Sequence, residues 1–443
     1  MQNSRLERKL TFFPLTNIVI ANMIGAGIFT TSGLLMQDLK NPVIMLVLWL
    51  AGGLIALCGA LNYSELGASM PEAGGEYAFL TRLYHPLTGF LSGWISFIVG
   101  FSAAIAASSI GFSEYIFSAF TAPGSHADSA LWLKKAMSVA VIALFTFIHM
   151  RGIKFSAGVQ NLLTVMKVIL IAGLIYLGFT AGKGQWGHLF QAETPPLNFA
   201  YLKTVGLSLM WILFAYSGWN AATYIGSEIK NPRKNLPFSL VSGTAFVMLL
   251  YLLLNLFFVY AVDPQQMEGV ISVTSLAAGH AFGRAMGFVT SLIIAFALFS
   301  SISAFLILGP RVYFAMGRDG VFFHSLSQIH SRFHAPVKAI LLQGIISSCM
   351  VLTGSFDQIL TYLGFSLGIF PILAVFGVFK LRREKRSVLK MPGYPLTTLV
   401  YLCTGTSILI LAFLERPMES GVALATVFSG IPVYYFFKRE KDI

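Results

Sequence analysis

Charge is what this chain most lacks. Asp, Glu, Lys and Arg together make up 11% of its 443 residues, whereas 56% of the residues are hydrophobic and the mean hydropathy is +0.75. Soluble domains carry about 25% charged residues, so the composition excludes an ordinary soluble protein and indicates a membrane protein. Cysteine is also scarce, and the three cysteines are too far apart for a metal motif: Cys58, Cys349 and Cys403.

Motifs of enzyme chemistry are missing or misplaced. The phosphate-binding pattern GxxxxGK[ST] occurs nowhere, so ATP-driven transport by this chain is not expected. The hydrolase pattern G-x-S-x-G occurs in GFSLG at 364–368, but there it falls inside an apolar helical run, not at the strand-to-helix turn that it needs. We therefore predict no enzyme activity, no cofactor and no metal.

Long apolar runs are what the chain has instead. About 20 apolar residues cross a bilayer as a helix. The first run follows basic residues but is too long for the hydrophobic region of a signal peptide. We predict an all-α integral membrane protein with twelve transmembrane helices, at 10–37, 41–64, 83–113, 136–150, 155–182, 204–227, 235–262, 285–310, 339–356, 358–379, 391–414 and 420–437.

The positive charges gather on one side of this topology. If the N-terminus is cytoplasmic, most of the 30 Lys and Arg residues fall in cytoplasmic loops, above all in 380–390 and 230–237. This is the positive-inside pattern, and it predicts a multi-pass protein of the cytoplasmic membrane with both termini in the cytoplasm. It also explains the net charge of +12 without a nucleic acid partner.

Two of the predicted spans contain weak helix formers at mid-depth. NMIGAGIF at 22–29 puts Gly25 and Gly27 near the middle of the first span, and the sixth span contains Ser217 and Gly218. Glycine costs about 1 kcal/mol against alanine in a helix interior. Interrupted segments at matching positions point to a transporter site between inverted repeats. Close packing of helices through small residues is the alternative explanation.

A break in the first span suits an α-amino acid. Unwound backbone is tolerated at membrane depth only where it lines a cavity. A half-helix beginning near Gly27 presents free N–H groups and a positive dipole end to a carboxylate. A half-helix ending near Met23 presents carbonyl groups to an ammonium group.

Four stretches resemble one transporter family. IGAGIF and CGALNYSELGASMPEAGGEYAFL resemble the first two helices and first inner loop of the amino acid–polyamine–organocation superfamily. FAYSGWNAATYIGSEIKNPRKNLP resembles helix 6 of its L-type amino acid transporter branch, and GRDGVFF the end of helix 8. The resemblance implies the five-plus-five inverted-repeat fold of the bacterial leucine transporter. The repeats are then 10–182 and 204–379 in a single domain of 1–443, with two further helices at 391–437.

The resemblance also implies a set of site residues. Amides at Ala26 and Gly27 would hold the substrate carboxylate, although many relatives have serine at the position of Ala26. Carbonyls at Met23, Phe214 and Ser217 would hold the amino group, with Phe214 as a gating aromatic and Phe305 against the substrate. The whole set is Met23, Ile24, Gly25, Ala26, Gly27, Phe214, Ala215, Ser217, Trp219, Asn220 and Phe305, with Tyr251 and Asn255 in a possible supporting layer.

Lys167 stands near the middle of the fifth span. A lysine at a helix centre costs about 2.5–3.5 kcal/mol on insertion scales, so an intramembrane charge is a functional candidate. In the L-type branch a helix 5 lysine resembling Lys167 stands in for the sodium ion of sodium-coupled members. Its ammonium group should reach carbonyls near Gly25 and a hydroxyl of Ser300, Ser301 or Ser303. A purely structural lysine is the alternative.

These features favour a sodium-independent transporter of neutral L-amino acids, working by exchange or proton symport. Spans 1, 3, 8 and 10 have no acidic residue at mid-depth, although a cationic amino acid or polyamine remains the alternative substrate, and a channel or receptor-like protein the alternative class. Animal members of the branch have a cysteine for an accessory glycoprotein after helix 3. The loop TAPGSHADSALW has none, so we expect a stand-alone, prokaryotic-type transporter.

Charges near the end of span 2 have two explanations. Glu65, Glu72 and Glu76 could form a gate network with Arg82 or a basic loop residue, or they could be ordinary interfacial charges. His149, beside Arg151, is expected at the interface.

Overall fold

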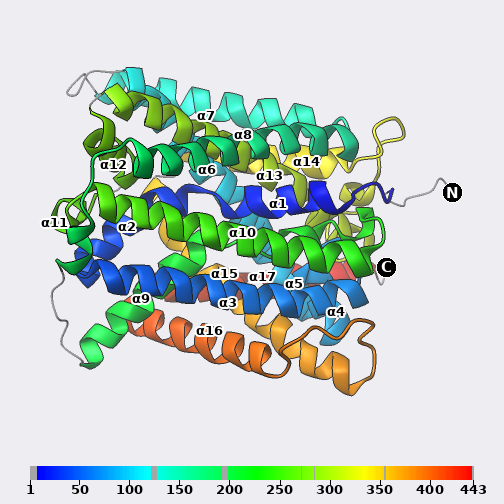
Figure 1. Cartoon of the computed structure of the whole chain (residues 1–443). Helices are drawn as coiled ribbons and strands as arrows, with labels where there is room; N and C mark the ends of the chain where they lie inside the picture. Colours follow the sequence, from blue (N-terminus) through cyan, green and yellow to red (C-terminus); the bar gives the residue numbers. More distant parts are fainter. Residues whose placement is uncertain are drawn as a thin grey trace.

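The computed structural model describes residues 7–120, 127–191, 198–270, 272–283, 285–353 and 356–441. These residues form a bundle of helices that run mostly along one direction (Figure 1). Within these ranges the only β-bridges are two isolated ones, Leu10 with Ile229 and Ala73 with Ile225. The all-α fold is therefore confirmed. The segment from Thr121 to His126, in which the loop without cysteine begins, lies outside the described residues.

Helices account for every predicted span. Among the described residues, ten helical segments are long and apolar enough to cross a membrane, and two shorter apolar helices are Phe199–Ala215 and Val337–Thr353. The α-helices are α1 (Phe12–Met23), α2 (Ala26–Leu39), α3 (Pro42–Ser69), α4 (Glu76–Leu83), α5 (Pro86–Ile95), α6 (Ala104–Phe120), α7 (Ala127–His149), α8 (Ile153–Thr180), α9 (Phe199–Ala215), α10 (Pro232–Ala261), α11 (Pro264–Met267), α12 (Val273–Phe282), α13 (Ala285–Arg318), α14 (Val337–Thr353), α15 (Phe356–Arg383), α16 (Leu396–Glu415) and α17 (Pro417–Lys441).

Proline starts several of these helices. α3 has Pro42 at its first position, and the side chain of Asn41 accepts a hydrogen bond from the Ile44 N–H group. α5 begins with Pro86 in the same way, after His85. Proline has no N–H group to leave unsatisfied in a first turn, and a capping side chain satisfies a second orphan donor. The sequence therefore fixes where these two spans begin.

The first span is broken where the sequence predicts. α1 ends at Met23 and α2 begins at Ala26, so Ile24 and Gly25 lie between two helical segments. The sixth span is also broken, because α9 ends at Ala215 and the chain turns through Gly218, where φ is +97°. A Cβ on Gly218 would lie 2.8 Å from the Asn22 carbonyl carbon, so only glycine fits there.

The second half of the sixth span differs from expectation. It continues as the short 3₁₀ helices η3 (Ala221–Tyr224) and η4 (Gly226–Glu228), not as an α-helix. The third span contains a π-helical segment, η1 (Ser96–Ala103), between α5 and α6. The short helices α4, α11 and α12 were expected to be loops. Their brevity gives little signal in a sequence.

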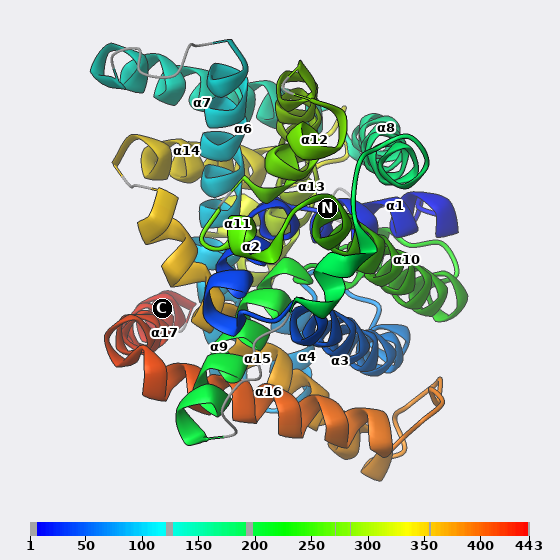
Figure 2. The same ribbon diagram turned by 60° about the vertical axis from the view of Figure 1, so that its left-hand side comes forward.

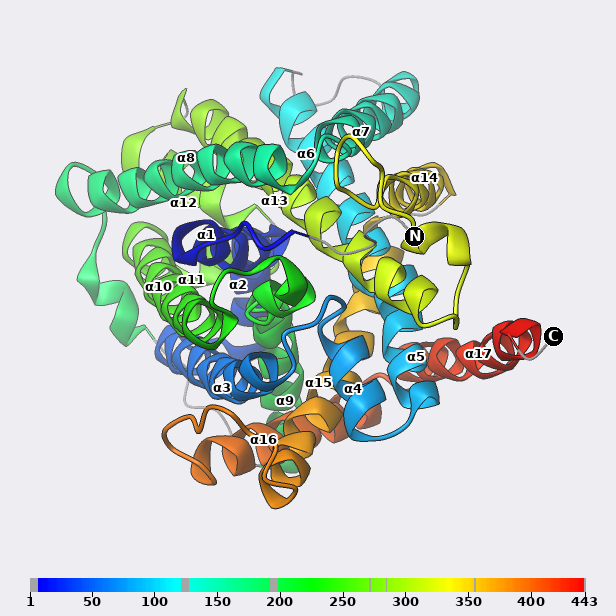
Figure 3. The same ribbon diagram turned by 90° about the vertical axis from the view of Figure 1, so that its right-hand side faces the viewer.

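The first broken span lies in the interior. The first span, the third span and α13 are the most buried of the long segments, and α16 is among the least buried. α1 packs on α10 and α8, and α13 packs on α6. Figures 2 and 3 show α7 on one side of the bundle and α16 on the opposite side, with α1, α2 and α13 between them.

One end of the bundle carries both the start of α1 and the end of α17, and we call it the terminal end (Figure 1). Here the N–H groups of Lys9 and Leu10 both donate to the Glu228 carbonyl, at 2.9 and 3.0 Å. The segment before α1 is thereby tied to the segment after the second break. The two broken spans therefore contact each other at the terminal end as well as at the breaks.

Candidate functional site

Two neighbouring cavities lie beside the breaks. The smaller has a volume of about 50 Å³ and the larger about 140 Å³. Six residues line both cavities: Asn22, Gly100, Phe214, Ser217, Phe305 and Leu367. All of the predicted substrate residues except Ile24 line one cavity or the other. The structure thus brings together residues that are far apart in the sequence.

The smaller cavity is built on the N-terminus of α2. Met23, Gly25, Ala26 and Gly27 line it, and no side chain caps the first turn of α2. The first N–H groups of a helix have no partner within the helix and carry the positive end of its dipole. This end of the cavity is suited to an anion such as a carboxylate.

The two glycines of the first span have different surroundings. A Cβ added to Gly25 would meet nothing within 4 Å, so this residue faces open space. A Cβ on Gly27 would lie 2.7 Å from the Cα of Ala215, so here α2 packs closely on the end of α9. The packing explanation of NMIGAGIF therefore applies to Gly27, whereas the surroundings of Gly25 leave room for a ligand.

Carbonyl groups from both breaks meet at Tyr251. Its buried hydroxyl lies 2.5 Å from the Met23 carbonyl oxygen and 3.1 Å from that of Ala215. The Met23 oxygen also accepts from the Gly25 N–H group at 2.9 Å. Since a hydroxyl has one hydrogen to donate, the two carbonyls share one donor. An ammonium group arriving here would compete with Tyr251 for the Met23 oxygen.

Asn255 supports Tyr251 from the next turn of α10. Its amide nitrogen donates to the Tyr251 carbonyl at 2.8 Å, and its amide oxygen accepts from the Ser32 hydroxyl of α2. Tyr251 and Asn255 therefore hold α10 against both halves of the first span.

Lys167 lies at the other side of the first break. Its side-chain nitrogen is 2.8 Å from the Ile24 carbonyl oxygen, 3.2 Å from that of Ala21 and 3.1 Å from the Ser301 hydroxyl. The expected contact with a carbonyl near Gly25 and with a serine of α13 is present. The other two serines bond elsewhere, Ser300 with Gln160 and Ser303 with His149. The ammonium is buried and meets the negative end of α1.

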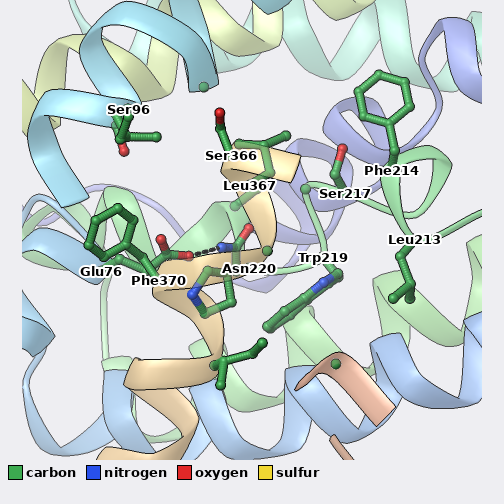
Figure 4. A pocket seen from close by; sticks show the side chains of 18 of the residues that line it. Glu76, Ser96, Leu213, Phe214, Ser217, Trp219, Asn220, Ser366, Leu367 and Phe370 are labelled. Carbon is green, nitrogen blue, oxygen red and sulfur yellow. Dashed lines mark hydrogen bonds between the residues drawn. The ribbon is translucent and has the colours of Figure 1, made fainter. Parts of the chain in front are cut away.

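An acidic residue that the sequence did not assign to the site lines the larger cavity. Figure 4 shows Glu76 joined to Asn220 by a hydrogen bond, with Trp219 and Phe370 close by. The Asn220 amide nitrogen lies 2.6 Å from a Glu76 carboxylate oxygen, and the Tyr63 hydroxyl lies 2.9 Å from the same oxygen. We expected Glu76 in a cytoplasmic loop because it falls between two spans.

The turn before α4 explains where Glu76 lies. Gly74 and Gly75 have φ angles of +108° and +54°, which favour glycine. The Gly74 N–H group donates to the Tyr224 carbonyl at 3.0 Å. The turn is thereby docked on η3, and the next side chain points into the bundle. The adjacent glycines of EAGGEY were the available signal in the sequence.

The π-helical segment is a second feature that was missed. Ser96, Gly100 and Phe101 of this segment line the larger cavity. π-Helical turns occur frequently at functional sites. Nothing in SFIVGFSA distinguishes it from an ordinary buried helix.

The remaining acids near the end of span 2 form ion pairs at the terminal end. Glu72 lies 3.1 Å from Arg82 and 3.5 Å from Arg318. Glu65 pairs with Arg382 of α15 at 2.6 Å. Arg82 is thus a partner of one of these acids, Glu65 pairs with a helix residue and not with a loop residue, and in the described part of the chain Glu76 forms no ion pair.

His149, which was expected at the interface, packs inside the bundle. It is buried, and its Nε2 atom lies 2.9 Å from the Ser303 hydroxyl. Among the described residues, no three His, Cys, Asp or Glu side chains are grouped so that they could hold a metal ion.

Comparison with known proteins identifies the family. Residues 10–434 match the amino acid permease family. The chain is 29% identical over 450 residues to the serine/threonine exchanger SteT of Bacillus subtilis, covering 99% of both chains. It is 27% identical to the human large neutral amino acids transporter small subunit 2, covering 97% of this chain and 80% of that one. It is 25% identical to the human cystine/glutamate transporter, covering 98% of this chain and 86% of that one. The chain therefore belongs to the amino acid permeases of the amino acid–polyamine–organocation superfamily, in the branch of the L-type transporters, and is an amino acid transporter and not an enzyme.

Proposed function

We propose that this chain moves neutral L-amino acids across the cytoplasmic membrane by alternating access, as a sodium-independent exchanger or proton-coupled symporter. One observation carries the proposal. The uncapped N-terminus of α2 and the carbonyl ends of α1 and α9 converge beside one small cavity. That pairing of donors and acceptors matches the carboxylate and ammonium groups of an α-amino acid.

The proposed fold has twelve membrane-spanning helices in two inverted repeats of five, 10–182 and 204–379, followed by two helices in 391–437. The break between α1 and α2 and the break after α9 support it, since they lie five spans apart, at matching positions in the two repeats. The excess of Lys and Arg in alternate loops supports a cytoplasmic location for both termini.

The substrate would lie across the two cavities. Its carboxylate would accept from the amides of Ala26 and Gly27, and its ammonium group would donate to carbonyls of Met23, Phe214 and Ser217. Its side chain would enter the larger cavity past Phe214 and Phe305, which line both cavities. Ile24, Gly25, Ala215, Trp219 and Asn220 would shape the walls.

A neutral side chain fits most of the larger cavity. Aliphatic and aromatic residues dominate its lining, including Ile55, Leu213 and Tyr401. The serine/threonine exchanger and the large neutral amino acids transporter are consistent with this preference by name. Glu76 favours a second candidate, a cationic amino acid, because its carboxylate lies on the cavity wall.

Lys167 supports independence from sodium. Its ammonium group already supplies a positive charge to the Ile24 carbonyl and the Ser301 hydroxyl. A sodium ion at that point would be redundant and would be repelled. We also propose that no accessory glycoprotein is required, because TAPGSHADSALW has no cysteine.

Counterflow in liposomes tests the proposal. Purified protein would be reconstituted with unlabelled L-serine, L-leucine or L-arginine inside, and entry of the labelled amino acid measured. We expect internal serine or leucine to accelerate entry, with choline in place of sodium. Acceleration by arginine alone would favour the cationic candidate. Entry that is indifferent to internal substrate would indicate a channel.

A further inference from the structure

Glu76 is the acid of its neighbourhood that has no basic partner. It is buried, whereas three other acids, near the end of α3 and in η4, pair with arginines: Glu65 with Arg382, Glu72 with Arg82 and Arg318, and Glu228 with Arg311. In the part of the chain that the structure describes, no Lys, Arg or His side chain forms an ion pair with Glu76.

The groups around Glu76 are neutral. Tyr63 of α3 and Asn220 donate to one carboxylate oxygen, and Tyr224 of η3 and Tyr401 of α16 are the other titratable side chains nearby. Three arginines of the elements packed against α4 pair with other acids: Arg311 with Glu228, Arg318 with Glu72 and Arg382 with Glu65. Lys380 of α15 bonds to the Leu83 carbonyl, and Asp319 after α13 accepts from Tyr77.

An unpaired buried carboxylate is costly unless it takes up a proton. Burial raises the pKa of the Glu76 carboxyl to about 7, even though the hydrogen bonds from Tyr63 and Asn220 lower it. Glu76 lines the larger cavity, so water that entered this cavity would exchange protons with its carboxyl group. The carboxyl group is thus placed to change charge near neutral pH.

We propose that Glu76 is a proton-binding site on the wall of the larger cavity, and that its protonation is linked to substrate binding. The link runs through Asn220. The ionised carboxylate holds the Asn220 amide, and Asn220 lies three residues after Ser217, which lines both cavities. Protonation weakens that charge-assisted bond and frees the segment 216–220. The proposal rests on the proposed transport function.

Direct titration tests the proton site without any substrate. The infrared band of a protonated carboxyl group would be followed against pH in the purified protein. We expect a band that titrates near pH 7 in the wild type, is missing in Glu76→Gln and is retained in Glu419→Gln, an exposed acid of α17. Asn220→Leu should move the midpoint upward, because it removes a donor to the ionised form. The same titration in Glu76→Gln as in the wild type would overturn the proposal.

Binding of L-serine and L-leucine between about pH 6 and about pH 8 tests the link. We expect a several-fold change in affinity in the wild type and in Glu419→Gln, and a flat profile in Glu76→Gln. Glu76→Asp keeps a titratable group and should keep a pH profile, which covers the case in which Glu76→Gln does not fold. A wild-type affinity that does not change with pH would overturn the link.

Failure to bind any amino acid would overturn the proposed function. The infrared titration would still decide whether Glu76 binds a proton. In one further outcome, the wild type shows no carboxyl titration near pH 7 and Glu76→Gln loses transport of arginine. Glu76 would then be a counter-ion for a cationic substrate, and the proton site would be wrong.

Discussion

The side-chain nitrogen of Lys167 lies 2.8 Å from the carbonyl oxygen of Ile24, the residue at which α1 gives way to the break. The ammonium group therefore stabilises the unwound backbone from α8, whereas the Tyr251 hydroxyl of α10 contacts the same break at the Met23 carbonyl oxygen. Ser301 lies between the same two partners, 3.1 Å from Lys167 and 2.8 Å from the Ile24 oxygen. These contacts join α8 and α13 through the first span.

Lys167→Ala should slow turnover at least tenfold, equivalent to about 1.4 kcal/mol of barrier. The loss follows because the Ile24 and Ala21 carbonyls lose their charged donor and keep the neutral Ser301 hydroxyl. Exchange of labelled substrate in liposomes measures it. Lys203→Ala is the control, since Lys203 pairs with Glu415 away from the cavities. Normal turnover in Lys167→Ala, or uptake by the wild type that collapses when choline replaces sodium, would contradict this role.

Gly25→Leu should abolish substrate binding without preventing folding. The φ of Gly25 is −121°, which any residue adopts, and a Cβ there meets nothing within 4 Å. The leucine side chain would therefore fill the smaller cavity. We expect at least a tenfold loss of affinity at an unchanged melting temperature. Gly173→Leu in α8, where a Cβ also meets nothing, should bind normally.

Gly27 offers the contrasting result. Because its Cβ would lie 2.7 Å from the backbone of Ala215, Gly27→Ala should lower the melting temperature. Equal melting temperatures for Gly25→Leu and Gly27→Ala would contradict the assignment of Gly25 to the cavity and of Gly27 to helix packing.

The breaks and the position of Lys167 could be predicted because each leaves a local signal. Two weak helix formers in an apolar run mark a break, and a lone charge marks a functional position. The adjacent glycines before Glu76 indicate a turn but not a cavity, because the place of Glu76 depends on the docking of the Gly74–Gly75 turn onto Tyr224, far away in the sequence. The second half of the sixth span likewise packs on α1 and α10, and these contacts between distant parts of the chain leave no local signal for its 3₁₀ form.

Orientation in the membrane can be measured with single cysteines in a background without Cys58, Cys349 and Cys403. A cysteine at Gln265 of α11 should react with an impermeant thiol reagent added outside the cell. A cysteine at Lys390 should react only after the membrane is permeabilised. Both positions are exposed, so access to the reagent depends only on the side of the membrane. The reverse pattern would invert the topology that we propose.

The most buried ion pair joins the segment after the second break to α13. The Glu228 carboxylate lies 2.9 Å from the Nε atom of Arg311, and their side chains are 1% and 2% exposed. Arg311 also donates to the Ile307 carbonyl at 2.7 Å. Removing one member of a buried pair leaves the other charge uncompensated.

Arg311→Met should therefore destabilise the protein by about 3–5 kcal/mol, measured as a loss of thermal stability in detergent. Lys134→Met, which breaks an exposed pair with Glu114, should cost about 0–1 kcal/mol. The double variant Glu228→Gln with Arg311→Met should recover part of the loss, since no charge stays buried without a partner. The double variant could instead lose as much stability as the two single variants together. The two residues would then act independently, and the ion pair would not hold the broken span to α13.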